Sequence, residues 1–376
     1  MKKLGLYVHF PFCASKCKYC NFNSYSDKNE LQLKYFQALL RELLMYKSDD
    51  IEIDTIFIGG GTPSIMFNGC ISTLLSEVRK NFKLSENIEI TIEANPNSID
   101  KNKTIEWKES GVNRVSIGLQ SINSNLLKLI GRPHTKQDYI RAYEDVVSAG
   151  ITNINTDCLI GLPRQKLSDV KKMLGFLMKL KLTHLSVYSL ILEEDTPLHK
   201  MVTSGQLKLP KEEKTLGMYN YTYKFLNENG FNRYEVSNFA LDGYECQHNL
   251  HTWEMHEYIG IGAGAYGFFD GVRYGNVEQI EDYISAVSTG NKPIKLEEKV
   301  GKTELFEESI MLGLRTKYGV NLKEIKDKYN VDLYETKKNE LNSFLKMGVI
   351  EIKNDNLVLT NAGYPILNKI ILELVY

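Results

Sequence analysis

The chain has 376 residues, of which 43% are hydrophobic and 25% are charged, so it is long enough for two domains with apolar cores. Its formal net charge of −1 gives no overall attraction to nucleic acid or to an acidic membrane surface. No apolar run approaches the ~18 residues that a membrane span requires, and the first residues lack the long apolar region of a signal peptide. We therefore expect a cytoplasmic protein with no integral membrane segment.

Short β-type runs alternate with amphipathic helical stretches up to about residue 200. The predicted strands cover residues 4–10, 54–60, 88–95, 113–121, 153–161 and 183–192, and the predicted helices cover residues 30–46, 71–82, 102–110, 137–149 and 167–180. Strands that alternate with helices of this length form parallel βαβ units with right-handed crossovers. The sequence thus predicts an α/β fold, and the spacing fits a barrel or partial barrel better than a sandwich.

The unusual residues of this region fall at the ends of predicted strands. Three cysteines follow the first strand, and the stretch GGGTPS, residues 59–64, ends the second. Glu93, Gln120 and Asp157 stand at or near the ends of later strands. Because parallel α/β folds build their sites at the carboxyl ends of the strands, we expect these residues to share one site.

The second half of the chain is less regular. Between residues 200 and 290 it contains a predicted helix at 212–228 and a glycine-rich segment at 258–269. The pattern changes after the stretch GNKPIK, which begins at residue 290. We therefore predict a first domain over residues 1–290 and a smaller α+β domain over residues 291–376.

The predicted C-terminal domain has a winged-helix-like pattern. Three helical stretches precede a β-ribbon that turns at residues 354–356. Lys plus Arg and Asp plus Glu each count 13 from residue 295 onward, so the domain lacks the basic surface of a nucleic-acid-binding module. A protein contact or a lid is the favoured role.

Cys13, Cys17 and Cys20 form the spacing C-x3-C-x2-C. Clustered thiolates in a reducing compartment favour soft metal sites over disulfides. A closed zinc site needs four ligands, and no second cysteine pair exists. Three thiolates can instead hold three irons of a [4Fe–4S] cluster, whose fourth iron is then open to another ligand. The other cysteines stand alone, as small core residues do: Cys70, Cys158 and Cys246.

The stretch YVHFPFCASKCKYCNFNS, residues 7–24, resembles the radical SAM superfamily and, within it, the HemN/HemW branch. The likeness extends through the C-terminal module. It implies a partial (β/α)6 TIM-like barrel, a [4Fe–4S] cluster and S-adenosylmethionine bound at the open iron. It also implies an electron donor, because one electron from the reduced cluster can cleave S-adenosylmethionine to a 5′-deoxyadenosyl radical.

The resemblance assigns further residues to S-adenosylmethionine. Gly60, Gly61 and Thr62 match positions that hold the methionine end of the cofactor. Arginine suits a carboxylate through its two-pronged donor geometry, and aspartate and glutamine suit ribose hydroxyls. The remaining positions that match cofactor contacts are Tyr7, Glu93, Gln120, Arg132 and Asp157. No residue is assigned a catalytic role.

Phe22 separates two activities within this branch. The coproporphyrinogen III oxidases usually continue the motif to C-x3-C-x2-C-x-C, whereas the haem chaperones have phenylalanine at the last position, as this chain does. The resemblance therefore favours a haem chaperone that passes haem to an acceptor hemoprotein. The alternative is the oxidase reaction, in which two propionates of coproporphyrinogen III become vinyl groups, so whether the protein is an enzyme stays open.

The stretch CQHNLHTW, residues 246–253, resembles an H-N-x-x-Y-W motif that this chaperone family associates with haem. His248, Asn249 and Trp253 match it, and Thr252 replaces the tyrosine. Imidazole is a common axial haem ligand, and tryptophan offers an apolar contact to the porphyrin. A structural role for His248 stays open, as does ligation by His251, His256 or Cys246.

Two further alternatives remain at this point. A winged-helix nucleic-acid protein with a structural cluster is disfavoured by the neutral C-terminal module. A homodimer is compatible with the sequence.

Overall fold

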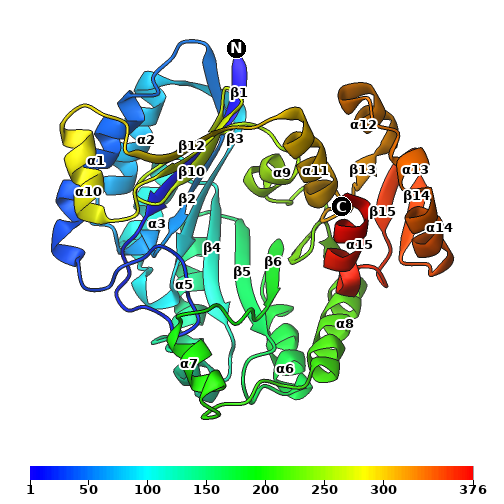
Figure 1. Cartoon of the computed structure of the whole chain (residues 1–376). Helices are drawn as coiled ribbons and strands as arrows, with labels where there is room; N and C mark the ends of the chain where they lie inside the picture. Colours follow the sequence, from blue (N-terminus) through cyan, green and yellow to red (C-terminus); the bar gives the residue numbers. More distant parts are fainter. Residues whose placement is uncertain (376) are drawn as a thin grey trace.

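The computed structural model describes residues 1–375, which form an α/β domain and a smaller C-terminal domain (Figure 1). Six parallel strands lie side by side in chain order at the centre of one 12-stranded sheet. They are β1 (Lys2–Phe10), β2 (Ile51–Gly60), β3 (Lys83–Ala94), β4 (Arg114–Gln120), β5 (Asn153–Ile160) and β6 (His184–Ser189). All six predicted strands, and the predicted partial-barrel order, are confirmed.

Helices cover the outside of this curved sheet. They are α1 (Gln32–Leu44), α2 (Cys70–Asn81), α3 (Lys101–Glu109), α4 (Ser124–Leu129), α5 (Lys136–Ser148) and α6 (Leu167–Leu177). Their apolar residues recur at helical spacing, so α1 buries Tyr35, Leu39 and Leu43 against the sheet. Side-chain caps fix several starts: Asp100 accepts from two backbone N–H groups of α3, and Thr135 forms a capping box at α5.

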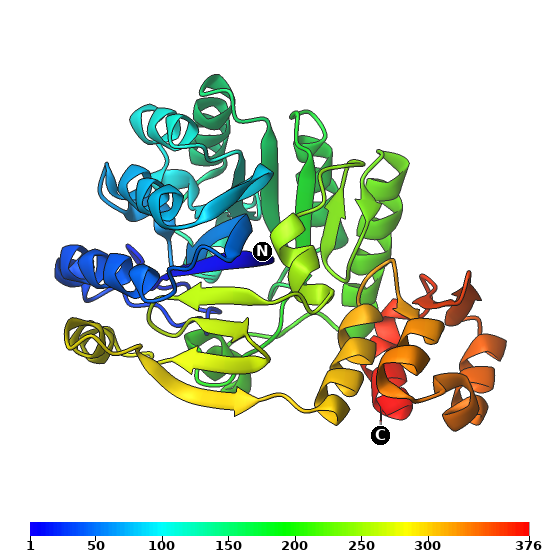
Figure 2. The same ribbon diagram turned by 90° about the horizontal axis from the view of Figure 1, so that it is seen from above.

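The sheet continues beyond both edges of the parallel strands, which the sequence pattern did not predict. At one edge β9 (Tyr258–Ile261) pairs in parallel with β1, and β10 (Tyr266–Phe269), β11 (Val272–Asn276) and β12 (Ile294–Lys299) follow in antiparallel order (Figure 2). At the other edge β8 (Asn238–Ala240) and β7 (Asn232–Arg233) follow β6. Because β12 belongs to this sheet, the α/β unit extends past residue 290, where we had predicted its end.

Four further helices lie outside the six βα units. These are α7 (Pro197–Thr203), α8 (Glu212–Glu228), α9 (Gln247–Trp253) and α10 (Ile280–Ser288). The helix predicted at residues 212–228 is confirmed as α8. Among residues 1–375, no helix combines the length and apolarity needed to span a membrane.

The C-terminal domain has its own apolar core and shows the predicted order of helices followed by a β-ribbon. It comprises α11 (Lys302–Gly313), β13 (Val320–Asn321), α12 (Leu322–Tyr329), α13 (Leu333–Thr336), α14 (Lys338–Lys346), β14 (Ile350–Lys353), β15 (Asn356–Leu359) and α15 (Leu367–Val375). The β14–β15 turn is at Asn354 and Asp355, both with positive φ, as a two-residue hairpin of type I′ requires.

Candidate functional site

The cysteines lie on a loop that connects β1 to α1 and is closed on itself by hydrogen bonds. The backbone N–H of Cys13 donates to the carbonyl of Tyr25 at 2.9 Å. The Lys16 ammonium spans the loop and donates to the carbonyls of Phe22 at 3.1 Å and Ser24 at 3.0 Å. The loop is therefore held in one shape by the chain itself.

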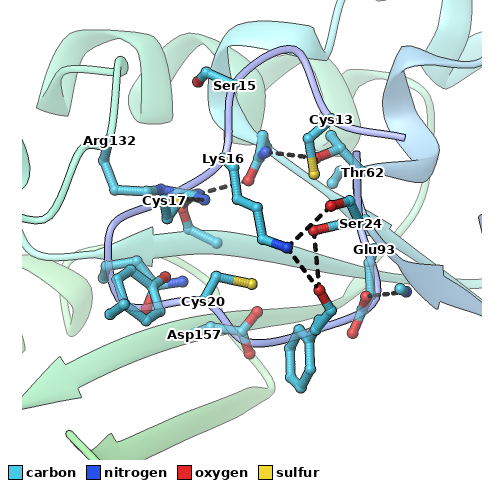
Figure 3. Close-up of a pocket in the computed structure, with 18 of the residues that line it drawn as sticks. Cys13, Ser15, Lys16, Cys17, Cys20, Ser24, Thr62, Glu93, Arg132 and Asp157 are labelled. Carbon is cyan, nitrogen blue, oxygen red and sulfur yellow. Dashed lines mark hydrogen bonds between the residues drawn. The ribbon is translucent and has the colours of Figure 1, made fainter. Parts of the chain in front are cut away.

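The carboxyl ends of β2 to β5 face this loop across a cavity of about 130 Å³ (Figure 3). The structure brings most of the predicted cluster and S-adenosylmethionine residues to its lining: Cys13, Cys17, Cys20, Gly60, Gly61, Thr62, Glu93, Gln120, Arg132 and Asp157. The strand-end residues thus line one cavity, as the sequence pattern predicts.

The glycines after β2 allow the backbone to pass close to the cysteine loop. The N–H groups of Gly61 and Thr62 donate to the carbonyls of Phe10 and Phe12, each at 2.8 Å. A Cβ atom at Gly61 would lie only 2.6 Å from the Phe12 carbonyl oxygen, and Gly60 has a φ of +106°. Only glycine fits this approach, which also leads the Thr62 hydroxyl to the Cys13 sulfur at 3.4 Å.

Arg132 places a buried positive charge beside the thiols. One terminal nitrogen donates to Asn95 Oδ1 and to the Gly118 carbonyl, both at 2.6 Å, and the other lies 3.5 Å from Cys17 Sγ. The buried Nε has no hydrogen-bond partner within residues 1–375. A guanidinium fixed in this way stabilises thiolates and anionic groups in the cavity.

Two carboxyl groups also line this cavity. Glu93 accepts from the N–H of Gly60 at 3.2 Å, and burial raises its pKa to about 8. Burial also raises the pKa of Asp157, which accepts from Asn155 at 2.8 Å and Ser116 at 3.0 Å. A cationic ligand or hydroxyl donors in the cavity would favour the ionised forms of both groups.

Several polar residues of this site were not selected from the sequence: Lys16, Asn95, Ser116 and Asn155. Asn95 also donates to the Thr62 hydroxyl, at 3.0 Å. Ser116 and Asn155 pair in register on β4 and β5, two residues before Gly118 and Asp157. The sequence signal for these residues was the presence of polar side chains at alternate positions of otherwise buried strands. Alternate residues of a strand point to the same face, so such a pattern indicates a polar site on that face.

A second cavity of about 910 Å³ adjoins the first. The two share Lys16, Phe22, Ser24, Gly60 and Glu93 in their linings. The larger one, termed the aromatic cavity below, is lined further by Tyr7, His9, Phe57, His248, Asn249, Thr252, Tyr258 and Tyr266 among others. Tyr7, expected to contact S-adenosylmethionine, thus lines the aromatic cavity, where its hydroxyl lies 2.9 Å from His9 Nδ1.

His248 is buried in the wall of the aromatic cavity. Its Nδ1 lies 2.9 Å from the Thr55 hydroxyl, and its ring stacks on Phe57 with centroids 5.3 Å apart. Burial lowers its pKa to about 3, so the imidazole is neutral at physiological pH. Glu89 fixes the start of α9 by accepting from the N–H groups of Gln247 and His248, both at 3.1 Å.

Trp253 does not reach the aromatic cavity. It lines a separate cavity of about 370 Å³, together with Met255, His256 and residues of the C-terminal domain. Successive residues of an α-helix are about 100° apart, so Trp253 projects about 140° away from His248, whereas Thr252 is about 40° away. The proposed haem residues therefore separate into His248 and Asn249 on one cavity and Trp253 on another.

The other candidate haem ligands have different surroundings. Cys246 is fully buried, and its sulfur lies 3.4 Å from Glu89 Oε1. His251 lies 3.5 Å from Asp54 and has its ring 4.8 Å from that of His256, centroid to centroid. None of the three lines the aromatic cavity.

The cysteine cavity fits a cluster better than a single ion. Within the described residues 1–375, no three His, Cys, Asp or Glu side chains are grouped to hold one metal ion. A [4Fe–4S] cluster takes each thiolate on a different iron, so the spread of the three thiols over one loop suits it. Arg132 Nε, which has no partner within residues 1–375, leaves one donor of the buried guanidinium unused near the thiols.

Comparison with known families defines the class. The model of the Radical SAM superfamily matches residues 7–177, and that of the HemN C-terminal domain matches residues 300–366. The solved structure of coproporphyrinogen III oxidase (HemN) from Escherichia coli superposes with a TM-score of 0.86 over 99% of this chain and 90% of that chain, at 20% identity. The fold is therefore that of a radical SAM protein with a HemN-type C-terminal domain, and this superfamily implies a [4Fe–4S] cluster and S-adenosylmethionine.

Sequence relatives define the family. Heme chaperone HemW of Lactococcus lactis is 36% identical over 98% of this chain and 96% of its own length. Heme chaperone HemW of Bacillus subtilis is 34% identical over 97% of both chains. The chain belongs to the HemW family.

Proposed function

We propose that the protein is a haem chaperone, which binds haem and transfers it to an acceptor hemoprotein, built on a [4Fe–4S] and S-adenosylmethionine core. The observation that carries this proposal is the aromatic cavity, whose wall includes a neutral imidazole, His248. Its volume of about 910 Å³ suits a large organic ligand, since small-molecule sites measure roughly 300–1,000 Å³. The names of the HemW relatives support the same function.

In this proposal Cys13, Cys17 and Cys20 would each hold one iron of the cluster, which after reduction by an electron donor would supply one electron for cleavage of S-adenosylmethionine. The backbone from Gly60 to Thr62 would border the methionine end of the cofactor, and Glu93 would pair with its ammonium group. Arg132 would balance the negative charge of the thiolates. Asp157 and Gln120 would accept and donate hydrogen bonds at the ribose, while Tyr7 closes the cavity wall.

His248 is the proposed axial ligand of haem iron. Its Nδ1 is occupied by Thr55, which leaves Nε2 as the nitrogen able to bind metal. A lowered pKa keeps the imidazole neutral over the physiological range, and Nε2 carries no proton in the tautomer in which Nδ1 donates to the Thr55 hydroxyl. Asn249 would contact the same haem, whereas Trp253 would act at the adjoining cavity between α9 and the C-terminal domain.

One observation favours the oxidase as a second candidate. The aromatic cavity shares part of its wall with the cysteine cavity, so a tetrapyrrole bound there would lie beside the cofactor. Phe22, at the position where the oxidase branch has a fourth cysteine, favours the chaperone.

The deciding experiment uses full-length protein with its cluster reconstituted under anaerobic conditions. Haem titration should give a saturable Soret band, and His248→Ala should weaken binding at least tenfold, while His251→Ala serves as the matched control on the same helix. Transfer is measured by mixing the haem-loaded protein with an apo-cytochrome. Conversion of coproporphyrinogen III with S-adenosylmethionine and a reductant would overturn a chaperone-only function.

The proposed setting is the cytoplasm, because the thiols of the cysteine loop require a reducing compartment. The proposed partners are haem, an acceptor hemoprotein and an electron donor. Homodimer formation is a further proposal, which light scattering of the reconstituted protein would test.

A further inference from the structure

Phe22 is a large apolar side chain that is exposed to solvent. It is 65% exposed, yet it lines both the cysteine cavity and the aromatic cavity. Its carbonyl accepts from the Lys16 ammonium at 3.1 Å and from the Ser24 hydroxyl at 3.3 Å. A ring on a backbone fixed in this way is presented to the cavities, and its exposure is not the result of a loosely held loop.

Tyr266 is a second exposed aromatic residue of the aromatic cavity. It is 53% exposed and begins β10, where it pairs in register with Gly275 of β11. A Cβ atom built at Gly275 would lie 2.9 Å from a ring carbon of Tyr266, so the ring rests against the backbone of the neighbouring strand. This contact fixes the direction of the tyrosine ring.

The segments that carry the two rings are joined directly. Asn23, next to Phe22, donates to the carbonyls of Ala263 at 2.9 Å and Glu278 at 3.1 Å. Gly264 has a φ of +76°, and a side chain there would collide with the Asn23 amide. The separation of Phe22 and Tyr266 is therefore set by hydrogen bonds between the cysteine loop and the segment that leads to β10.

We propose that Phe22 and Tyr266 form an aromatic clamp for the haem macrocycle, an inference that rests on the proposed haem-chaperone function. Flat conjugated ligands gain affinity by stacking on rings that are already fixed and exposed. The proposed iron ligand, His248, lines the same cavity. Lys16 is the only lysine or arginine among the residues lining this cavity, so the macrocycle faces, more than the propionates, provide the recognition.

The clamp gives Phe22 a positive role. At this position the oxidase branch has a cysteine, which offers no aromatic face. The phenyl ring forms part of the wall between the cysteine cavity and the aromatic cavity, so the same residue completes the haem site and borders the cofactor site.

The test is haem titration of the cluster-reconstituted protein and its variants. Phe22→Ala and Tyr266→Ala should each lower haem affinity about five- to tenfold, whereas Phe22→Trp and Tyr266→Phe should keep it within about twofold. Phe67→Ala is the matched control, because Phe67 is 51% exposed and lies outside both cavities. The iron content and the binding of S-adenosylmethionine should remain unchanged in Tyr266→Ala.

The outcomes separate the clamp from the function on which it rests. If the unaltered protein binds no haem, the proposed function fails. If it binds haem but both alanine variants retain full affinity, the clamp is wrong and the haem-chaperone function stands. An equal loss in Phe67→Ala would mean unspecific binding of haem to surface aromatics and would also overturn the clamp.

Discussion

The cysteine cavity and the aromatic cavity share a wall but are built differently. The cysteine cavity is small, and polar contacts set the positions of its thiols, its guanidinium and its carboxyl groups. The aromatic cavity is seven times larger, at about 910 against 130 Å³, and exposed or stacked rings dominate its lining. The first arrangement suits ligands that polar contacts hold in one pose, and the second suits a flat apolar ligand that must also leave.

This difference gives the two cavities separate roles. Polar groups aimed at fixed points give specificity and cannot tolerate a poor fit, because each unpaired group costs free energy. Stacking surfaces give affinity with less dependence on exact pose, which suits a cargo that is handed on. Each variant below alters one cavity and asks whether the other responds.

Loss of the cluster should be the largest effect. Cys17→Ser removes one of three thiolate ligands, so we expect iron and sulfide content to fall to near zero after reconstitution. Haem affinity should stay within about threefold of the unaltered protein, because no cysteine lines the aromatic cavity. Cys70→Ser is the matched control, since Cys70 lies on α2 outside both cavities. A parallel loss of haem binding would show that the cavities are not independent.

The substitution Arg132→Met should have the next largest effect, on stability and on S-adenosylmethionine affinity. It leaves Asn95 and the Gly118 carbonyl without their donor in a buried site, which costs about 1–3 kcal/mol of unfolding free energy. S-adenosylmethionine affinity should fall about tenfold or more as the positive charge is lost. Urea unfolding and equilibrium dialysis measure the two effects. The exposed Arg141→Met is the control, and equal effects in both variants would contradict a role for Arg132 in the cavity.

The cysteine cavity was more predictable from the sequence than the aromatic cavity. Strand periodicity placed Glu93 and Asp157 at the same edge of the sheet, and the cysteine spacing limited the kind of metal site. The aromatic cavity depends on β9, whose pairing with β1 joins segments about 250 residues apart and leaves no local pattern, and on β10, which pairs with β9. The separation of His248 from Trp253 was readable from helical geometry, but only once α9 was known to be a helix.

Two residues of the aromatic cavity, His248 and Glu93, should change the stability of the protein with pH in opposite directions. The pKa of His248 is lowered from 6.5 to about 3, so the unfolded chain binds the extra proton and stability falls as pH drops below 6.5. The pKa of Glu93 is raised from 4.5 to about 8, so stability falls as pH rises from 4.5 to 8. Each slope is at most about 1.4 kcal/mol per pH unit.

Urea unfolding of the protein without ligands, from pH 4.5 to 8.5, would resolve these slopes. Between pH 4.5 and 6.5 the two contributions oppose each other in the unaltered protein, so His248→Gln should make stability fall with rising pH over this range. Glu93→Gln should make stability rise with pH over the same range and should flatten the alkaline side, from pH 6.5 to 8. Glu86→Gln and His256→Gln are the controls, because both residues are exposed. Unchanged slopes in both test variants would mean that neither group is buried as the fold requires.

The smallest expected effect concerns Thr252, where the family motif has tyrosine. Thr252 is exposed, lines the aromatic cavity and lies one helical turn after His248, with its hydroxyl 3.3 Å from the His248 carbonyl. Thr252→Tyr adds a third aromatic face to the cavity, so haem affinity should rise about two- to fivefold. Thr252→Val, which adds no ring, is the control. A fall in affinity would mean that the haem occupies the space above Thr252. The smaller threonine would then be needed to leave space for the macrocycle.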